Sequence, residues 1–259
     1  MRAIHSVRAD PFTVSTGARG LTRKSAEVQW QLLYHIAAWV SVVAVGLIPI
    51  SITVFIIWPP PETVIGHFVL LQEHWWLGLL GLDLIYLVAN TLLLPMILAL
   101  YLALRRVNES LMLLGITLVL IGTVALLTSN PLVEMWTLSN RYAAATTTAE
   151  RTLYLTAGEV YLTGYTGTAY HAHYILGSIG LLLMALVMLR SPLFGRVAAY
   201  TGIVANIVAF GLYVPVIGVA LSTISGIAYL IWFVLIIRRL FQLSTVDSPG
   251  DKLSNGSLQ

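Results

Sequence analysis

The residues best suited to chemistry lie inside long apolar stretches of the chain, where ionisable groups are few. Asp83, Tyr86 and Asn90 are spaced i, i+3 and i+7, so a helix would carry them on one face. A carboxylate inside a membrane-spanning segment is costly to bury, and it is typical of a ligand site, a proton path or a buried partner group. This spacing predicts a polar stripe that runs inward from the outer end of the second apolar stretch.

A second stripe with the same spacing follows later in the chain, at His171, Tyr174 and Ser178. If the two helices are neighbours, Asp83 and His171 lie at similar depth and can pair. We therefore predict a small ligand pocket formed by Asp83, Tyr86, Asn90, His171, Tyr174 and Ser178. The alternative is that Asp83 is a structural anchor, hydrogen-bonded between helices.

Four side chains on the same side of the predicted protein are of types that bind zinc or iron: Glu73, His74, His171 and His173. Their spacing disfavours a helical metal site, because Glu73 and His74 are adjacent and a His-x-His pair points about 200° apart on a helix. The pair shares a face only where the backbone is extended. We expect these histidines to lie at the membrane–water interface, and we identify no cofactor. A metal site is the less favoured alternative.

The usual catalytic motifs are absent from the sequence. It contains no Gly-x-Ser-x-Gly, no His-Glu-x-x-His and no glycine-rich phosphate loop, and its zero cysteines exclude disulfides, thiolate metal sites and a cysteine nucleophile. The net charge of +3 comes without a dense basic cluster, so no nucleic-acid partner is expected.

The elements that must position these residues are membrane-spanning helices. Of 259 residues, 58% are hydrophobic and 10% charged, against about 25% charged in soluble domains. A spanning helix needs about 20 mostly apolar residues. Six such runs predict an all-α polytopic membrane protein: Leu32–Ile57, Leu77–Leu104, Leu111–Leu127, Tyr170–Leu189, Val197–Val214 and Ile217–Ile237. Pro215 separates the last two, and we favour a tight turn there over a kink in one very long helix.

The distribution of cationic residues predicts the orientation. With the N-terminus in the cytoplasm, all of the 14 Lys and Arg residues except Arg141 and Arg151 fall on the cytoplasmic side, which is the positive-inside pattern. Both termini are then cytoplasmic. The predicted organisation is a basic tail over residues 1–29, a membrane domain over 30–243, and a polar, disordered tail over 244–259.

Two predicted outer segments, about 58–76 and 128–169, are longer than turns. The second is too long to lack structure in a compact protein. Thr147 and Glu150 match a capping box, which predicts a helix near Thr148–Leu162. We expect another helix near Leu132–Tyr142.

Several short polar marks carry a family resemblance. They are Leu82-Asp-Leu-Ile-Tyr86, Leu104-Arg-Arg-Val-Asn108, Thr146-Thr-Thr-Ala-Glu-Arg151, Gly158-Glu159, Val187-Met-Leu-Arg-Ser191 and Arg196-x-x-x-Tyr200-x-Gly202. From about Trp30 to Leu243 the chain resembles a family of uncharacterised prokaryotic multi-span proteins, catalogued as domain of unknown function 4386. The resemblance implies about six helices in the cytoplasmic membrane of a bacterium or archaeon. The family brings no known activity, so no catalytic residue is carried over.

Three functions remain open from the residues. The leading hypothesis, which leans away from an enzyme, is a membrane protein that binds a lipid, a small apolar ligand, or a membrane partner protein or second copy at its outer face. The second is a membrane-embedded enzyme, metal-dependent in one version, acting on a lipid or isoprenoid with Asp83, Glu159 and His171 as acid, base or ligands. The third is a proton-coupled carrier that uses Asp83 and His171 as a relay.

Overall fold

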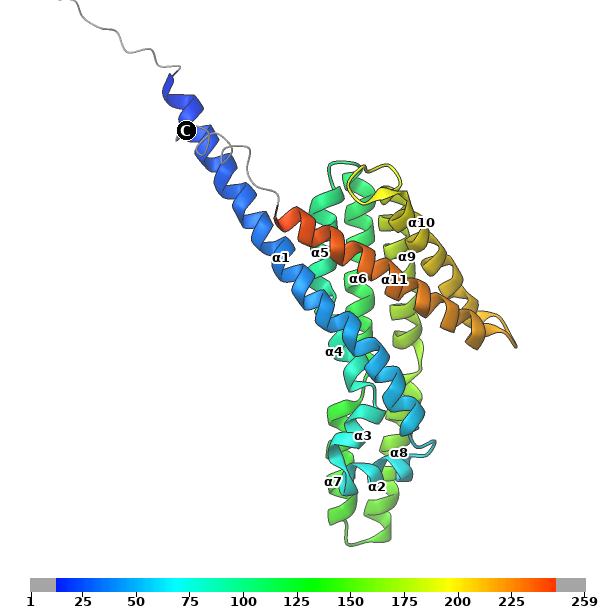
Figure 1. The fold of residues 1–259 in the computed structure, drawn as a ribbon. Helices are drawn as coiled ribbons and strands as arrows, with labels where there is room; N and C mark the ends of the chain where they lie inside the picture. Colours follow the sequence, from blue (N-terminus) through cyan, green and yellow to red (C-terminus); the bar gives the residue numbers. More distant parts are fainter. Residues whose placement is uncertain (1–12, 246–259) are drawn as a thin grey trace, which may run out of the picture.

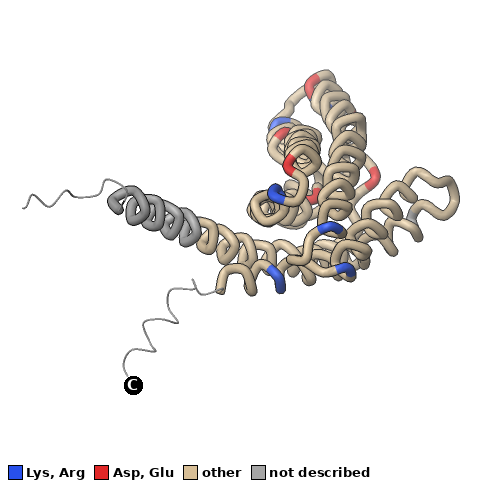
Figure 2. The backbone as a smooth tube through the Cα atoms, turned by 90° about the horizontal axis from the view of Figure 1, so that it is seen from above, with Lys and Arg blue, Asp and Glu red and all other residues tan. Residues whose placement is uncertain are grey.

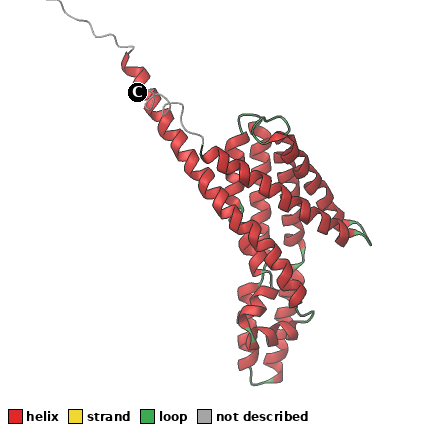
Figure 3. Ribbon diagram, in the orientation of Figure 1, coloured by secondary structure: helices red, strands yellow, loops and turns green. Residues whose placement is uncertain are grey.

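The computed structural model describes the backbone of residues 13–245, and the side chains of residues 30–218 and 220–245. Within this range the chain is helical and contains no strand (Figure 3). The helices are α1 (Thr13–Ile57), α2 (Val64–Glu73), α3 (Trp75–Gly81), α4 (Leu84–Leu92), α5 (Leu94–Leu104), α6 (Glu109–Ser129), α7 (Leu132–Ala144), α8 (Thr148–Tyr165), α9 (Thr168–Met188), α10 (Gly195–Ala209), the 3-10 helix η1 (Phe210–Tyr213) and α11 (Gly218–Ser244).

Six helical stretches are long and apolar enough to cross a membrane, which confirms the predicted all-helical, six-span class. They are Trp30–Ile57, Leu84–Leu104, Glu109–Ala144, Thr148–Met188, Gly195–Tyr213 and Ala220–Ser244. Helix α1 begins at Thr13, inside the predicted N-terminal tail. Beyond Thr245, the predicted C-terminal tail lies outside the described residues.

The predicted second span, Leu77–Leu104, is wrong as a single helix, because it is divided into α3, α4 and α5. Asp83 separates α3 from α4 with a left-handed backbone (φ 63°), so it does not lie two turns inside a helix. Asp is among the few non-glycine residues that tolerate this conformation. Pro95 lies in the first turn of α5, where its missing N–H costs no helical hydrogen bond, and this explains the second break.

Helices α2, α3, α7 and α8 form a distal subdomain at one end of the bundle (Figure 1). Its core consists of Val64, Phe68, Leu71, Leu82, Leu132 and Met135. The hydroxyl of Ser139 donates to the Phe68 carbonyl at 2.9 Å and ties α7 to α2. Helices α7 and α8 lie where the sequence predicts them, and the capping box of Thr147 and Glu150 is formed.

The spanning part of the molecule is built on the antiparallel pair α6 and α9, which lie side by side (Figure 1). Each has 21 residues and is about 31 Å long, close to the roughly 30 Å hydrocarbon thickness of a bilayer. Small residues let their backbones approach, since a Cβ added at Gly180 would lie 2.5 Å from the Gly115 carbonyl oxygen.

Helices α1, α10 and α11 complete the bundle. Helix α1 packs on α4, α5 and α11, and α10 packs on α9 and α11. The fully buried ring of Trp232 packs directly against Gly202 of α10, where a Cβ atom would clash with it. The chain turns between η1 and α11, where Val216 has φ 71°, so the predicted tight turn at Pro215 is confirmed.

Candidate functional site

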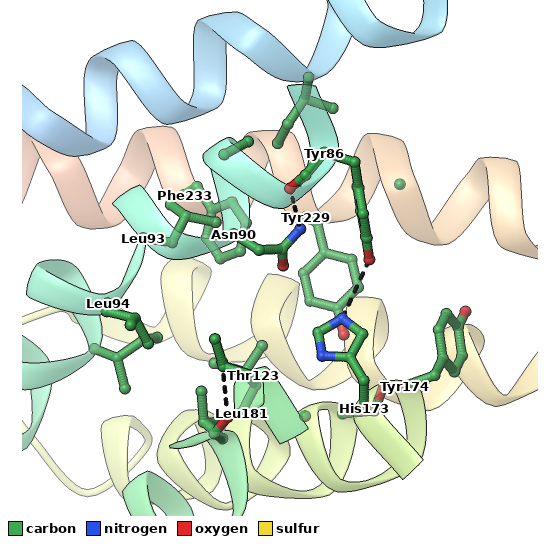
Figure 4. A pocket seen from close by; sticks show the side chains of 17 residues that line it. Tyr86, Asn90, Leu93, Leu94, Thr123, His173, Tyr174, Leu181, Tyr229 and Phe233 are labelled. Atoms are coloured by element: carbon green, nitrogen blue, oxygen red, sulfur yellow. Dashed lines mark hydrogen bonds between the residues drawn. The ribbon is translucent and has the colours of Figure 1, made fainter. Parts of the chain in front are cut away.

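Two adjoining cavities lie among the spanning helices. The deep cavity, about 230 Å³, is bounded by side chains of α1, α4, α5, α6, α9 and α11 (Figure 4). The tyrosine cavity, about 570 Å³, lies toward the distal subdomain and includes Asp83 in its wall. Tyr86, Tyr174, Gly226 and Tyr229 line both, so the two cavities share a boundary. The larger one alone falls within the roughly 300–1,000 Å³ of small-molecule sites.

A hydrogen-bonded chain links three helices at this boundary. The Nδ1 of His173 lies 3.0 Å from the Gly122 carbonyl oxygen, which can only accept, so Nδ1 carries the proton. In the neutral imidazole Nε2 is then an acceptor, and the Tyr86 hydroxyl, 3.3 Å away, donates to it. Figure 4 shows this contact together with a second hydrogen bond, in which the amide nitrogen of Asn90 donates to the Tyr86 carbonyl at 2.9 Å. The chain fixes α4, α6 and α9 around the cavity.

Two of the other tyrosines are also held in place by internal hydrogen bonds. Tyr229 donates to Asn206 Oδ1 at 2.6 Å, and Tyr174 donates to the Ala209 carbonyl at 2.8 Å. Both bonds reach α10, which lies behind the cavities. Because these hydroxyl protons are already engaged, the rings present mainly aromatic surface to the space they enclose.

Asp83 is the one carboxylate in the walls of the two cavities, and the described lining contains no Lys or Arg. It accepts a hydrogen bond from the Tyr165 hydroxyl of α8. Within the described residues no cationic side chain pairs with it. Its left-handed backbone at the start of α4 directs the half-buried carboxylate to this junction between bundle and distal subdomain.

Four of the six residues predicted to form a pocket gather around the deep cavity: Tyr86, Asn90, Tyr174 and Ser178. Asp83 lines the tyrosine cavity instead, and His171 lines neither. The predicted Asp83–His171 pair is not formed. Asp83 bonds to Tyr165, and the exposed His171 has its Nδ1 3.1 Å from the Tyr213 hydroxyl.

His171 and His173 diverge because both lie on helix α9, two residues apart. The alternative of an extended backbone at these two residues, which would have let both histidines bind one metal ion, is therefore wrong. Glu73 ends α2, and His74 follows it at the junction with α3. Across the part of the chain whose side chains are described, no three His, Asp or Glu residues are close enough together to hold a metal ion.

The three residues of the enzyme hypothesis do not converge. Glu159 is exposed on α8, and His171 is exposed beside Tyr213, whereas Asp83 faces the tyrosine cavity. The arrangement offers one carboxylate in an aromatic enclosure rather than an acid–base pair.

Three polar residues of the deep cavity were not among the predicted pocket residues. His173 was considered only as a metal ligand, and Thr123 and Tyr229 were not considered. A usable signal existed for the last, because Ser222, Ser225 and Tyr229 repeat the i, i+3, i+7 spacing of the other two stripes.

Comparison of the whole chain with protein-family models, curated proteins and solved structures gave no match.

Proposed function

We propose that this protein binds a membrane lipid, or a lipid-like amphiphile, in the two adjoining cavities. The observation that carries the proposal is the difference between the walls of the two cavities, which adjoin at Tyr86, Tyr174 and Tyr229. The deep cavity is walled mainly by apolar side chains such as Leu93, Ile97 and Phe233. The tyrosine cavity adds Asp83 and a set of hydroxyl groups. An amphiphile has the same division between tail and head.

The deep end suits the apolar part of such a ligand. Most of its polar side chains, including Tyr86, Asn90 and Thr123, make hydrogen bonds within the protein, so an alkyl group there leaves few groups unsatisfied. A tail that leaves the bilayer for this cavity gains little hydrophobic free energy, because lipid is already apolar. Selectivity must therefore come from shape and from the polar end.

The proposed setting is the cytoplasmic membrane of a prokaryote, as the resemblance to the family of unknown function 4386 implies. We propose that both termini lie in the cytoplasm and the distal subdomain outside. The charged residues, coloured in Figure 2, support this orientation through their positions in the helices and loops. The distal subdomain and the loop before it hold Glu62, Glu73, Glu134, Glu150 and Glu159, against Arg141 and Arg151. The opposite end holds Arg105, Arg106, Arg190, Arg196, Arg238 and Arg239, which fits the positive-inside rule.

The test uses a glycine at the shared boundary. Gly226 lines both cavities, and a Cβ added there meets no atom within 4 Å. The side chain of Gly226→Leu therefore starts in open space and extends into the boundary of the two cavities. Gly46→Leu is the matched control, because Gly46 is equally open but lies on the exposed face of α1 and lines neither cavity.

The measurement is native mass spectrometry of protein released from detergent, with quantification of the extracted lipid. We expect the wild type and Gly46→Leu to retain a lipid-sized ligand at close to one per chain, and Gly226→Leu to lose it. Equal retention by all three proteins would show that any bound lipid lies elsewhere, and the proposal would fail.

A further inference from the structure

We propose that the tyrosine cavity binds the ammonium head of a cationic or zwitterionic amphiphile, with Asp83 as its counter-charge. This inference rests on the proposed function, because it names the chemical class of the ligand for the same cavities. Three features of the site support it: a carboxylate without a cationic partner, an enclosure of aromatic rings, and an acidic approach.

The first feature is the incomplete surroundings of Asp83. An ionised carboxylate removed from water requires an opposite charge or several hydrogen-bond donors. The described residues give it the Tyr165 hydroxyl and no Lys, Arg or His. Because Asp83 is half-buried and lines the cavity, a ligand that enters the cavity can supply the missing opposite charge. An ammonium ion supplies that charge.

The second feature is the set of rings around the same space. Phe55, Tyr86, Tyr170, Tyr174 and Tyr229 line the tyrosine cavity together with Asp83. The faces of aromatic rings attract cations, and such enclosures recognise quaternary ammonium groups. Their quadrupoles add to the attraction of the carboxylate, so amine and trimethylammonium groups are both suitable.

The third feature is the charge of the neighbouring subdomain. Five glutamates belong to the distal subdomain or the loop before it, against two arginines, so its potential attracts cations toward the adjacent cavity. An anionic head would meet Asp83 with no cation in the described lining to compensate it. The site therefore discriminates against anionic lipids as well as in favour of cations.

The probes are four amphiphiles with ten-carbon chains: decyltrimethylammonium, decanol, decanoate and decylphosphocholine. Each is titrated, below its micelle concentration, into protein in lipid nanodiscs, and its dissociation constant is measured by calorimetry. The wild type should bind decyltrimethylammonium at least about tenfold more tightly than decanol, and decanoate more weakly than decanol. Decylphosphocholine distinguishes the sources: binding as tight as that of decyltrimethylammonium indicates a phospholipid headgroup, and weaker binding indicates a simple amine.

Two variants separate charge from structure. Asp83→Asn removes the charge alone, because Asn also adopts the left-handed conformation and its amide oxygen can accept the Tyr165 hydrogen bond. It should lower the affinity for decyltrimethylammonium about tenfold and leave that for decanol unchanged. Tyr170→Leu tests the ring contribution independently, and it should weaken the cation several-fold more than the alcohol.

The outcomes distinguish this inference from the proposed function. A wild type that binds decanol as tightly as decyltrimethylammonium, with both lost in Gly226→Leu, keeps the binding function and overturns the cation preference. A preference that persists in Asp83→Asn and in Tyr170→Leu also overturns it. If no probe distinguishes the wild type from Gly226→Leu, the proposed function itself fails.

Discussion

Substitution of Gly180 by Ala should loosen the central α6–α9 pair. The added Cβ would lie 2.5 Å from the Gly115 carbonyl oxygen and 2.8 Å from the Val119 Cγ2 atom. Ordinary contacts are about 3.5–4.0 Å, so the helices must separate by about 1 Å. Separation also draws α9 away from Gly122, to whose carbonyl His173 donates.

The expected cost follows from two opposing effects. Overpacking of a close contact costs about 1–3 kcal/mol, and replacing Gly by Ala in a helix returns up to about 1 kcal/mol. The net loss is then about 1–2 kcal/mol. At Gly177, three residues earlier on the same helix, an added Cβ meets nothing within 4 Å. Gly177→Ala should therefore be neutral or stabilise by a few tenths of a kcal/mol.

The assay is thermal unfolding of both variants in the same detergent, followed by circular dichroism. Gly180→Ala should melt several degrees below the wild type, and Gly177→Ala at or above it. If both variants melt together, the close approach of α6 and α9 is not what holds this pair, and the packing argument is refuted.

Three further predictions address the distal subdomain and the orientation. Burial of His67 in α2 lowers the pKa of its imidazole, partly offset by the Pro61 carbonyl, so the unfolded chain binds the proton more readily. The contribution of His67 to stability should be complete above about pH 6.5 and decrease as the pH falls toward the lowered pKa of the folded state. His67→Gln should remove this pH dependence from melting temperatures measured at several pH values, and an unchanged pH dependence would contradict the assignment to His67. Thr147→Val removes the hydroxyl that caps α8 and should cost about 1 kcal/mol, measured as a lower melting temperature, and a wild-type value would contradict the cap's role. Because the chain has no cysteine, Ala144→Cys and Ser110→Cys each introduce one exposed thiol. A membrane-impermeant maleimide should label Ala144→Cys in intact cells and Ser110→Cys only after permeabilisation. The reverse labelling pattern would invert the proposed orientation.

The six spans and the distal helices α7 and α8 were predictable because their signals are local, whereas the breaks in the second span and the helix α2 were not. Long apolar runs indicate spans whatever their neighbours, and Thr147 with Glu150 marks the start of α8 by side-chain chemistry alone. Pro215 likewise indicates the turn before α11.

The site was predicted only in part, because its geometry depends on where helices break and pack. The apolar sequence around Asp83 looks like continuous helix, but the backbone is left-handed there and the carboxylate turns toward Tyr165. The spacing of Tyr86 and Asn90 on α4 survives this break, so both reach the deep cavity. Which of two histidines faces inward depends on the rotation of α9, and periodicity alone does not give that rotation.

The most direct measurement of the central claim is an experimental density map of the wild-type protein and of Gly226→Leu in lipid nanodiscs. The account predicts elongated non-protein density in the wild type that runs from Leu93 in the deep cavity to Asp83 in the tyrosine cavity, and no such density in the variant. Cavities that hold only water in the wild type, or density that is unchanged in Gly226→Leu, would contradict it.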